Sequence, residues 1–390
     1  MRLTKTLALA ASAMLALGAC GGGSGDGGGD GDITIAVIVP LTGASAKTAE
    51  QMKNAAELAA DEVNADGGIG GRDLVLKVYD DELTPEAATR EAQRAITRDK
   101  AVAIIGAQSS GEALAIREVA ERSKIPFITS SATSEAVTQD ATFTYRIAPL
   151  LTDYANGVVD TAEQLGLKSP VLLNDSGPAG LQLKDLFIDR AKEVGLTFAG
   201  DPIEFPINGT DVTAQVASAK RENPDGVLIG GSAGSDHGLV AKTMLEQGLD
   251  TPLIGFSPIL VNDAIEIAGE AYSELPGVYS LQNLDQTKDA TQAFFDAYTA
   301  EFGEDKLTEQ PAQTYDTVKI LAAALEATDG EGGQALSDAL EGLDPYDGVS
   351  GKAGTTISFG EGKHDGFEGD YLVTYKMNGP TAEQVDLTQE

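Results

Sequence analysis

The sequence is poor in the residues that build disulfides, metal centres and indole-lined sites. Its 390 residues include one cysteine and two histidines, and tryptophan is absent. A single cysteine cannot form an internal disulfide, and one thiol with two imidazoles leaves few ligands for a transition metal. We therefore expect neither a metal nor any other cofactor.

Basic residues are also scarce. The chain has 27 Lys and Arg against 61 Asp and Glu, which gives a formal net charge of -34. A surface of this sign repels phosphate groups, whereas nucleic-acid binding depends on Lys and Arg that neutralise phosphates. The charge balance excludes nucleic acid as a partner.

The N-terminal segment has the composition of an export signal. Arg2 and Lys5 form a short basic region ahead of an apolar stretch at residues 7–17. This stretch suits the hydrophobic part of a signal peptide and is too short to span a bilayer comfortably.

The one cysteine follows directly, in the sequence LALGACGGGSGDGGGDGD at residues 15–32. Leu17-Gly18-Ala19-Cys20 resembles the lipobox of bacterial lipoproteins, in which the cysteine is lipidated. We predict a lipoprotein signal peptide at residues 1–20, a lipid anchor on Cys20 and a flexible glycine-rich tether at 21–31. A monomer held at the outer face of the membrane, or in the periplasm, is expected.

From Asp32 onward, short β-branched runs alternate with helical patterns, which is typical of a parallel sheet covered by helices. The predicted strands occupy 33–40, 73–82, 102–107, 126–131, 170–175, 226–231, 252–257 and 277–282. The predicted helices occupy 49–64, 85–98, 112–123, 157–165, 180–194, 212–222, 239–247, 290–302 and 315–327. The fold class is α/β, with doubly wound sheets because parallel crossovers are right-handed.

The alternating pattern restarts after residue 149, and the length favours two domains of roughly 150 residues each. We predict that lobe 1 contains 32–149 and 280–355, and that lobe 2 contains 150–279 and 356–390. Several crossings would make a hinge with a cleft between the lobes.

Several segments together point to one family. They are VPLTG at 39–43, ELAADEVNADGGIGGRDLVLKVYDDE at 57–82, IIGAQSSG at 104–111, PFITSSAT at 126–133, TYDTVKILAAAL at 314–325 and GVSGK at 348–352. They resemble the extracytoplasmic solute-binding proteins of branched-chain amino acid ABC transporters, the Leu/Ile/Val-binding family. The resemblance implies the type I periplasmic-binding-protein fold, capture of a small molecule by lobe closure and delivery to a membrane permease.

Polar residues follow two neighbouring strands of lobe 1. Ser109 and Ser110 come after one strand and open a helix, and Ser131, Ala132 and Thr133 come after the next. A carboxylate at such a strand edge gains hydrogen bonds and about 0.3–1 kcal/mol from the helix N-terminus. The resemblance implies that Ser110, Ser131 and Thr133 hold the carboxylate and ammonium of an amino acid.

The other expected contacts are Lys47 in lobe 1, which the resemblance places over the ligand, and Ser232 and Ser257 in lobe 2. The acidic partner that the family commonly offers to the ammonium is absent from its position in lobe 2. Asp175 or Asp236 could replace it, or each could be a turn residue that bonds nearby backbone. An amino acid, an amide and a carboxylate are therefore all open as ligands.

One motif suggests an enzyme instead. Gly230 to Gly234 reads GGSAG, which matches the G-x-S-x-G elbow of a hydrolase nucleophile at Ser232, and Asp344 and His364 follow in triad order. No oxyanion-type loop precedes the motif, and His364 lies in a polar turn. An esterase is the remote alternative.

Taken together, the sequence predicts a non-enzymatic, substrate-binding component of an ABC importer. A ligand sensor that presents its closed form to a membrane receptor is the other reading of the same fold.

Overall fold

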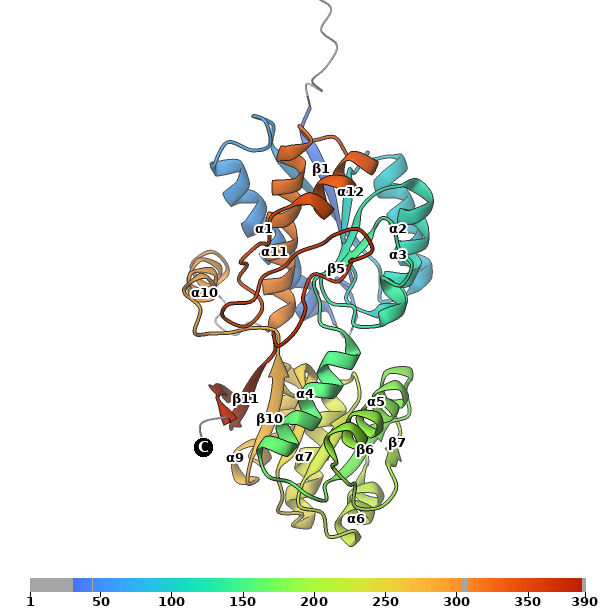
Figure 1. The fold of residues 1–390 in the computed structure, drawn as a ribbon, viewed down its shortest axis with the longest axis vertical. Helices are drawn as coiled ribbons and strands as arrows, with labels where there is room; N and C mark the ends of the chain where they lie inside the picture. The colour runs from blue at the N-terminus through green and yellow to red at the C-terminus, as the bar shows by residue number, and fades with distance from the viewer. Residues whose placement is uncertain (1–30, 44, 304–307, 388–390) are drawn as a thin grey trace, which may run out of the picture. The chain divides into compact units, whose positions relative to one another are not determined.

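Two mostly parallel sheets, each covered by helices on both faces, organise the chain (Figure 1). The computed structural model describes residues 31–43, 45–303 and 308–387. The predicted signal peptide, Cys20 and nearly all of the predicted tether lie outside these ranges.

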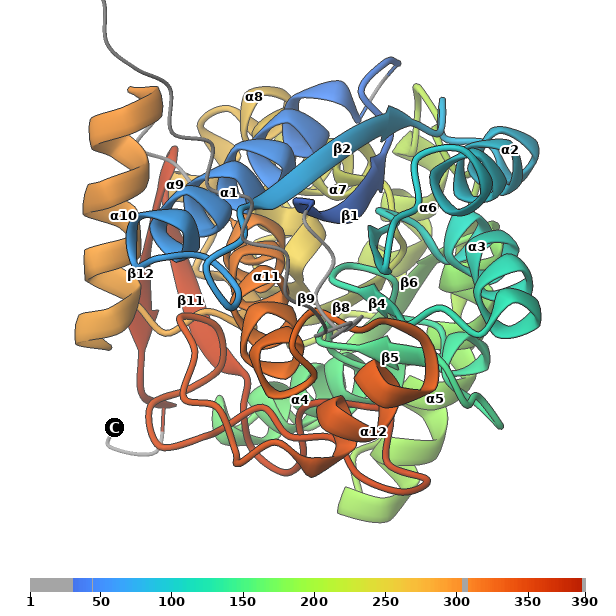
Figure 2. The ribbon, with the colours of Figure 1, turned by 90° about the horizontal axis from the view of Figure 1, so that it is seen from above.

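The first sheet is wholly parallel. Its strands, in spatial order, are β2 (Leu74–Asp80), β1 (Ile33–Val39), β3 (Ala103–Gly106), β4 (Phe127–Thr129) and β5 (Thr144–Arg146). Its helices are α1 (Ala46–Ala65), α2 (Pro85–Thr97), α3 (Ser110–Ser123), α10 (Asp289–Phe302), α11 (Glu309–Ala327) and α12 (Gly333–Gly342), with a short 3₁₀ turn η1 (Glu135–Val137). Figure 2 shows α2 and α3 on one side of the strands and α1, α10 and α11 on the other.

The second sheet has five parallel strands and an antiparallel pair at one edge. In spatial order these are β12 (Thr381–Val385), β11 (Val373–Asn378), β10 (Val278–Gln282), β9 (Leu253–Phe256), β8 (Val227–Gly230), β6 (Val171–Asp175) and β7 (Ile203–Phe205). Its helices are α4 (Leu151–Gln164), α5 (Pro178–Val194), α6 (Thr213–Arg221), α7 (Gly234–Gln247), α8 (Asn262–Ala268) and α9 (Ala271–Glu274), with the 3₁₀ turn η2 (Ser257–Leu260). The prediction of two doubly wound α/β lobes is confirmed.

Local sequence explains these elements. Strand β1 reads ITIAVIV and is buried on both faces, which is why its apolar run is continuous rather than alternating. Helix α2 begins where the Thr84 hydroxyl accepts a hydrogen bond from the Ala87 N–H, and Pro85 occupies the first helical position. Helix α5 ends at Gly195, whose φ of 77° is the left-handed cap that glycine adopts without strain.

Each sheet has an apolar core on both faces. In lobe 1, Met52 of α1, Phe294 of α10 and Leu321 of α11 belong to one core. Ala92 of α2 and Ile116 of α3 belong to the other. In lobe 2, Val158 of α4 and Phe187 of α5 pack in one core, and Val216 of α6 and Met244 of α7 in the other.

Within the described ranges the chain crosses between the sheets after β5, after β10 and before β11. The second crossing contacts a loop of lobe 1, because the Gly351 N–H donates to the Asn283 carbonyl at 3.1 Å. The second crossing therefore has backbone support from lobe 1.

Two segments belong to the opposite lobe from the one predicted. Residues 280–282 belong to β10 of the second sheet rather than to lobe 1. Ile357, Phe359 and Tyr371 pack into the core of the first sheet, so 357–371 extends lobe 1 rather than lobe 2. The burial of apolar side chains assigns 357–371 to lobe 1, because the sequence of this segment shows no regular hydrophobic period.

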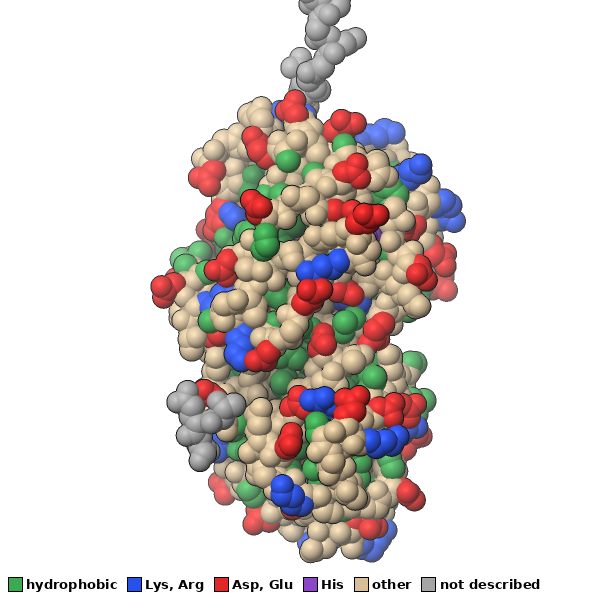
Figure 3. Space-filling model, viewed as in Figure 1, with side chains coloured by type: hydrophobic (Ala, Val, Ile, Leu, Met, Phe, Trp, Pro, Cys, Tyr) green, Lys and Arg blue, Asp and Glu red, His purple; other side chains and the backbone are tan. Residues whose placement is uncertain are grey.

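Charge is dispersed over the viewed face. Figure 3 shows acidic side chains over both sheets, with lysines and arginines between them and no single basic patch on this face. No helix in the described ranges has both the length and the apolar character that a membrane crossing requires.

Candidate functional site

The first half of the candidate site lies at the carboxyl edge of the first sheet. Strand β3 ends at Gly106, where a Cβ would collide with the Ile38 carbonyl oxygen, so only glycine fits. Ser109 then precedes α3, and its hydroxyl donates to the Glu112 carboxylate. Ser110 is the first helical residue and accepts a hydrogen bond from the Ser134 N–H at 3.3 Å. The two predicted loops are thus brought together.

The loop at 131–134 is fixed by its backbone. The Ala132 N–H donates to the Thr129 hydroxyl at 3.1 Å, and the Thr133 carbonyl accepts from the Leu151 N–H at 3.0 Å. The buried Arg146 donates to the Ser134 carbonyl at 2.6 Å. Preorganised hydrogen-bonding groups of this kind lose little entropy on binding.

The hydroxyls of Ser131 and Thr133 have no hydrogen-bond partner in the described part of the chain. Both residues are half-buried. Ser130, one position earlier, is instead buried and shares a 2.9 Å hydrogen bond with Thr314 of α11. Two unpaired hydroxyls beside the start of α3 are therefore available to an anionic group.

The two acidic candidates of lobe 2 turn out to be turn residues. The Asp175 carboxylate is fully buried and accepts from the Gly177 N–H at 2.8 Å and the Ser232 N–H at 3.1 Å. Asp236 accepts from the Asn208 N–H at 2.9 Å. Burial raises the pKa of both carboxyls, and backbone donors counter that effect. Their carboxylates hold loops of the second lobe.

The remaining predicted contacts are scattered. Lys47 is exposed in the first turn of α1, and Ser232 is exposed after β8. The side chain of Ser257 lies near the carboxyl of Glu309 and helps to lower its pKa. For these three residues a role in binding stays a prediction.

Sequence reasoning missed Glu309, the first residue of α11. It is 3% exposed, and it accepts hydrogen bonds from the Tyr154 hydroxyl and, at 2.6 Å, from the Asn283 N–H. These two donors come from α4 and the second crossing, and the nearby Ser257 follows β9. The carboxyl thus lies where the two lobes and their crossing meet.

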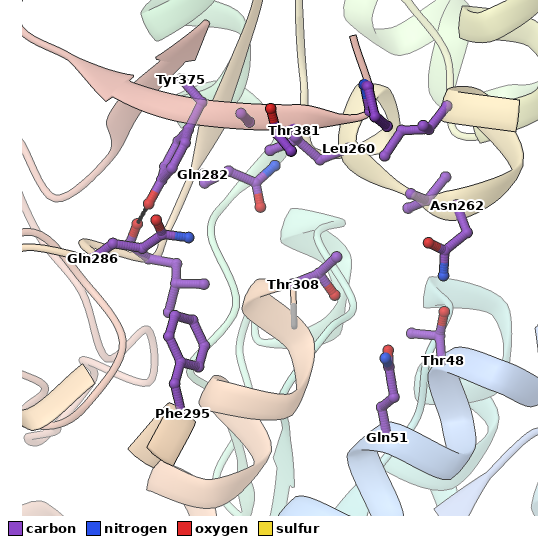
Figure 4. Close-up of a pocket in the computed structure, with 15 residues that line it drawn as sticks. Thr48, Gln51, Leu260, Asn262, Gln282, Gln286, Phe295, Thr308, Tyr375 and Thr381 are labelled. Carbon is purple, nitrogen blue, oxygen red and sulfur yellow. Dashed lines mark hydrogen bonds between the residues drawn. The ribbon is translucent and has the colours of Figure 1, made fainter. Parts of the chain in front are cut away.

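A pocket of about 230 Å³ adjoins this point, and we call it the hinge pocket (Figure 4). Its walls are Thr48, Gln51, Leu260, Val261, Asn262, Ile265, Gln282, Leu284, Gln286, Phe295, Thr308, Tyr375, Pro380, Thr381 and Ala382. Figure 4 shows Thr48 and Gln51 projecting from α1, with Thr308 at the start of α11. The lining mixes apolar side chains with amides and hydroxyls and contains no charged residue, and none of the predicted contacts belongs to it.

The proposed triad does not assemble in the structure. His364 hydrogen-bonds the Thr144 carbonyl at 2.8 Å and stacks on Tyr145, so it belongs to the first sheet. Ser232 follows β8 of the second sheet. No hydrogen bond links the two within the described residues.

Two parallel-sheet lobes, polar loops at the strand ends and several crossings define the class of two-lobed small-molecule-binding proteins. The chain belongs to the periplasmic binding protein family, whose model matches residues 32–376. This confirms the resemblance to solute-binding proteins, and it implies a location outside the cytoplasm.

Individual relatives agree with this assignment. "Leu/Ile/Val-binding protein homolog 8" of Brucella abortus is 28% identical over 346 residues, which is 83% of each chain. The LivJ substrate-binding protein of Streptococcus pneumoniae, solved with isoleucine, has a TM-score of 0.79 at 23% identity and covers 91% of this chain and 99% of its own. A solute-binding protein of Rhodopseudomonas palustris, solved with 3,4-dihydroxybenzoic acid, has a TM-score of 0.76 at 23% identity and covers 91% and 96%.

Proposed function

We propose that the protein captures a small solute bearing a carboxylate or amide between its lobes and passes it to the permease of an ABC importer. A branched-chain amino acid or a related carboxylate is the expected solute. The observation that carries the proposal is the pair of unpaired hydroxyls on Ser131 and Thr133, beside the N-terminus of α3. The Brucella relative and the isoleucine complex of LivJ support the amino acid, and the dihydroxybenzoate complex supports a plain carboxylate.

Solute binding would change the angle between the lobes at the crossing segments. A solute held at the edge of the first sheet and touched by loops of the second gains contacts only when the lobes approach. It therefore shifts the hinge toward a closed form by as much as it binds that form more tightly. A permease that contacts both lobes would then distinguish loaded from empty protein.

A thermal-shift screen of the purified protein tests this proposal. A ligand at 100 times its Kd that binds only the folded state adds about 2.7 kcal/mol to stability. We expect a raised melting temperature with leucine, isoleucine, valine or a carboxylate of similar size. A shift with sugars alone would contradict the proposal.

The Thr133→Ala variant is expected to bind that solute more weakly by about 1–3 kcal/mol, because one partner of a buried hydrogen bond is lost. Calorimetric titration measures the difference. Thr97→Ala is the matched control, since Thr97 ends α2 and its hydroxyl bonds only the Gln93 carbonyl of the same helix. Equal affinities in the two variants would mean that Thr133 does no more than shape the loop.

We also propose that Cys20 carries a lipid anchor, on the strength of the Leu-Gly-Ala-Cys sequence at residues 17–20. The Cys20→Ser variant is expected to move from the membrane fraction to the soluble fraction on cell fractionation, because stable anchoring needs the acyl chains. Retention in the membrane fraction would contradict lipidation.

A further inference from the structure

We infer that the hinge pocket is a second binding site, which takes a neutral polyhydroxylated molecule of about the size of a monosaccharide. The pocket is separate from the proposed solute site, because no residue of the loops at 109–111 and 131–134 belongs to its lining. The inference therefore goes beyond the proposed function and does not depend on it.

The first argument is that both lobes and a crossing build the pocket. Thr48 of α1 and Phe295 of α10 come from lobe 1, whereas Asn262 is the first residue of α8 in lobe 2. Gln282 ends β10, and Leu284 belongs to the second crossing that follows. A molecule in the pocket would therefore contact both lobes and the segment that joins them (Figure 4).

The second argument is the supply of unused hydrogen-bonding groups. The Gln282 side chain is 2% exposed and its nitrogen donates to the Ser280 hydroxyl at 3.2 Å, but its oxygen accepts no hydrogen bond among the described residues. The half-buried side chains of Asn262 and Thr48 have no hydrogen bond within the described ranges either, and Figure 4 shows them facing each other. Polar groups taken out of water without partners are costly, so they favour a ligand that supplies the missing hydrogen bonds.

The third argument is the neutrality of the lining, which contains no Lys, Arg, His, Asp or Glu. An ionised ligand would lose its hydration in the pocket without gaining an ion pair, which disfavours carboxylates and ammonium ions. A purely apolar ligand would leave the amide groups unpaired. The pocket therefore suits an uncharged polar molecule.

The distribution of polar groups and the volume narrow the class of ligand. Amides and hydroxyls can both donate and accept, and Figure 4 shows Gln282 and Thr381 on one side of the pocket and Thr48 and Thr308 on the other. A ligand with hydroxyls in several directions meets this arrangement better than one with a single polar head, and its ring carbons can pack on Phe295. The volume of about 230 Å³ lies below the roughly 300–1,000 Å³ of pockets for drug-sized ligands, which fits a monosaccharide or a cyclic polyol.

Calorimetric titration of the purified protein with glucose, galactose and myo-inositol tests the inference. We expect at least one of the three to bind, and to bind also when the carboxylate or amino acid found in the thermal-shift screen is saturating, because the two sites are separate. Failure of all three to bind, or complete displacement of the polyol by that solute, would overturn the inference. Failure of the carboxylates and amino acids alone would contradict the proposed function and leave the second site standing.

Two variants locate the polyol. Thr48→Val and Asn262→Leu each remove one hydrogen-bonding group, from lobe 1 and from lobe 2, with little change in shape. Each is expected to weaken polyol binding about 10-fold and to leave the affinity for the carboxylate or amino acid within a few-fold of wild type.

Gln93→Leu is the matched control, because Gln93 is an exposed amide of α2 that belongs to neither site, and we expect wild-type affinity for both ligands. Wild-type polyol affinity in Thr48→Val and Asn262→Leu would overturn the inference. An equal loss of polyol affinity in Thr133→Ala would also overturn it, since the polyol would then occupy the solute site.

Discussion

Replacing Arg146 with alanine is expected to lower the free energy of unfolding by about 3 kcal/mol, near the low end of the range for a broken buried ion pair. The Arg146 side chain is fully buried and lies 2.7 Å from the Asp365 carboxylate. Asp365 is itself 36% exposed, so water can solvate it once its partner is gone, and this keeps the loss at the low end. Urea unfolding of the two proteins measures the difference.

The same substitution should weaken solute binding. Arg146 donates to the Ser134 carbonyl at 2.6 Å and to the Thr138 hydroxyl at 2.5 Å, and so holds the loop that carries Ser131 and Thr133. Arg90→Ala is the control, because Arg90 is 56% exposed in its pairs with Glu82 and Glu91 and should change neither property measurably. Wild-type stability and affinity in Arg146→Ala would contradict this account of the loop.

The contribution of His237 to stability is expected to fall as the pH drops below about 6.5. Burial lowers the pKa of this fully buried imidazole from 6.5 to about 4, and its Nε2 lies 3.1 Å from the Gly231 carbonyl. Between pH 6.5 and about 4 the imidazole is protonated in the unfolded chain and neutral in the folded protein. Stability present above pH 6.5 is therefore lost down to about pH 4, by roughly 3 kcal/mol in total.

The variant His237→Gln removes this titration and keeps a donor for the Gly231 carbonyl. Between pH 7 and pH 5 the unfolding free energy of the wild type should fall by about 2 kcal/mol relative to that of the variant. Asp81 and Asp316, whose pKa values burial raises to about 6, act in the opposite direction but are common to both proteins. Parallel pH profiles would show that His237 does not titrate in this window.

Most of the fold could be predicted because its central strands are buried on both faces and its helices are amphipathic. The continuous apolar run of β1 and the Thr84-Pro85 start of α2 are strong local signals. Helix α11 was predicted from residue 315 but begins at Glu309, since its first turn is polar and the apolar period starts later. Pro311, which is tolerated in the first turn of a helix, is the sequence feature that indicates the earlier start.

The candidate site could be predicted only where it follows strands in sequence. Ser110 opens the helix that follows β3 and Ser131 lies in the loop that follows β4, so the order of strands and loops is enough to find them. Glu309 could not be found in this way. Its donors, Tyr154 and Asn283, are far from it in the chain, and only the packing of both lobes brings them together.

The roles of Asp175 and Asp236 were undecidable from sequence for a related reason. A carboxylate after a strand can face a ligand or bond backbone N–H groups, and both uses favour the same residue type. The contacts of Asp175 with Gly177 and Ser232 show that it holds the loops after β6 and β8.

A crystal structure with the solute that most raises the melting temperature tests the central claim most directly. We predict electron density for a carboxylate within hydrogen-bonding distance of the Ser131 and Thr133 hydroxyls and of the first N–H groups of α3. Density for the solute in the hinge pocket alone, beside Thr48 and Asn262 and away from both hydroxyls, would contradict the account.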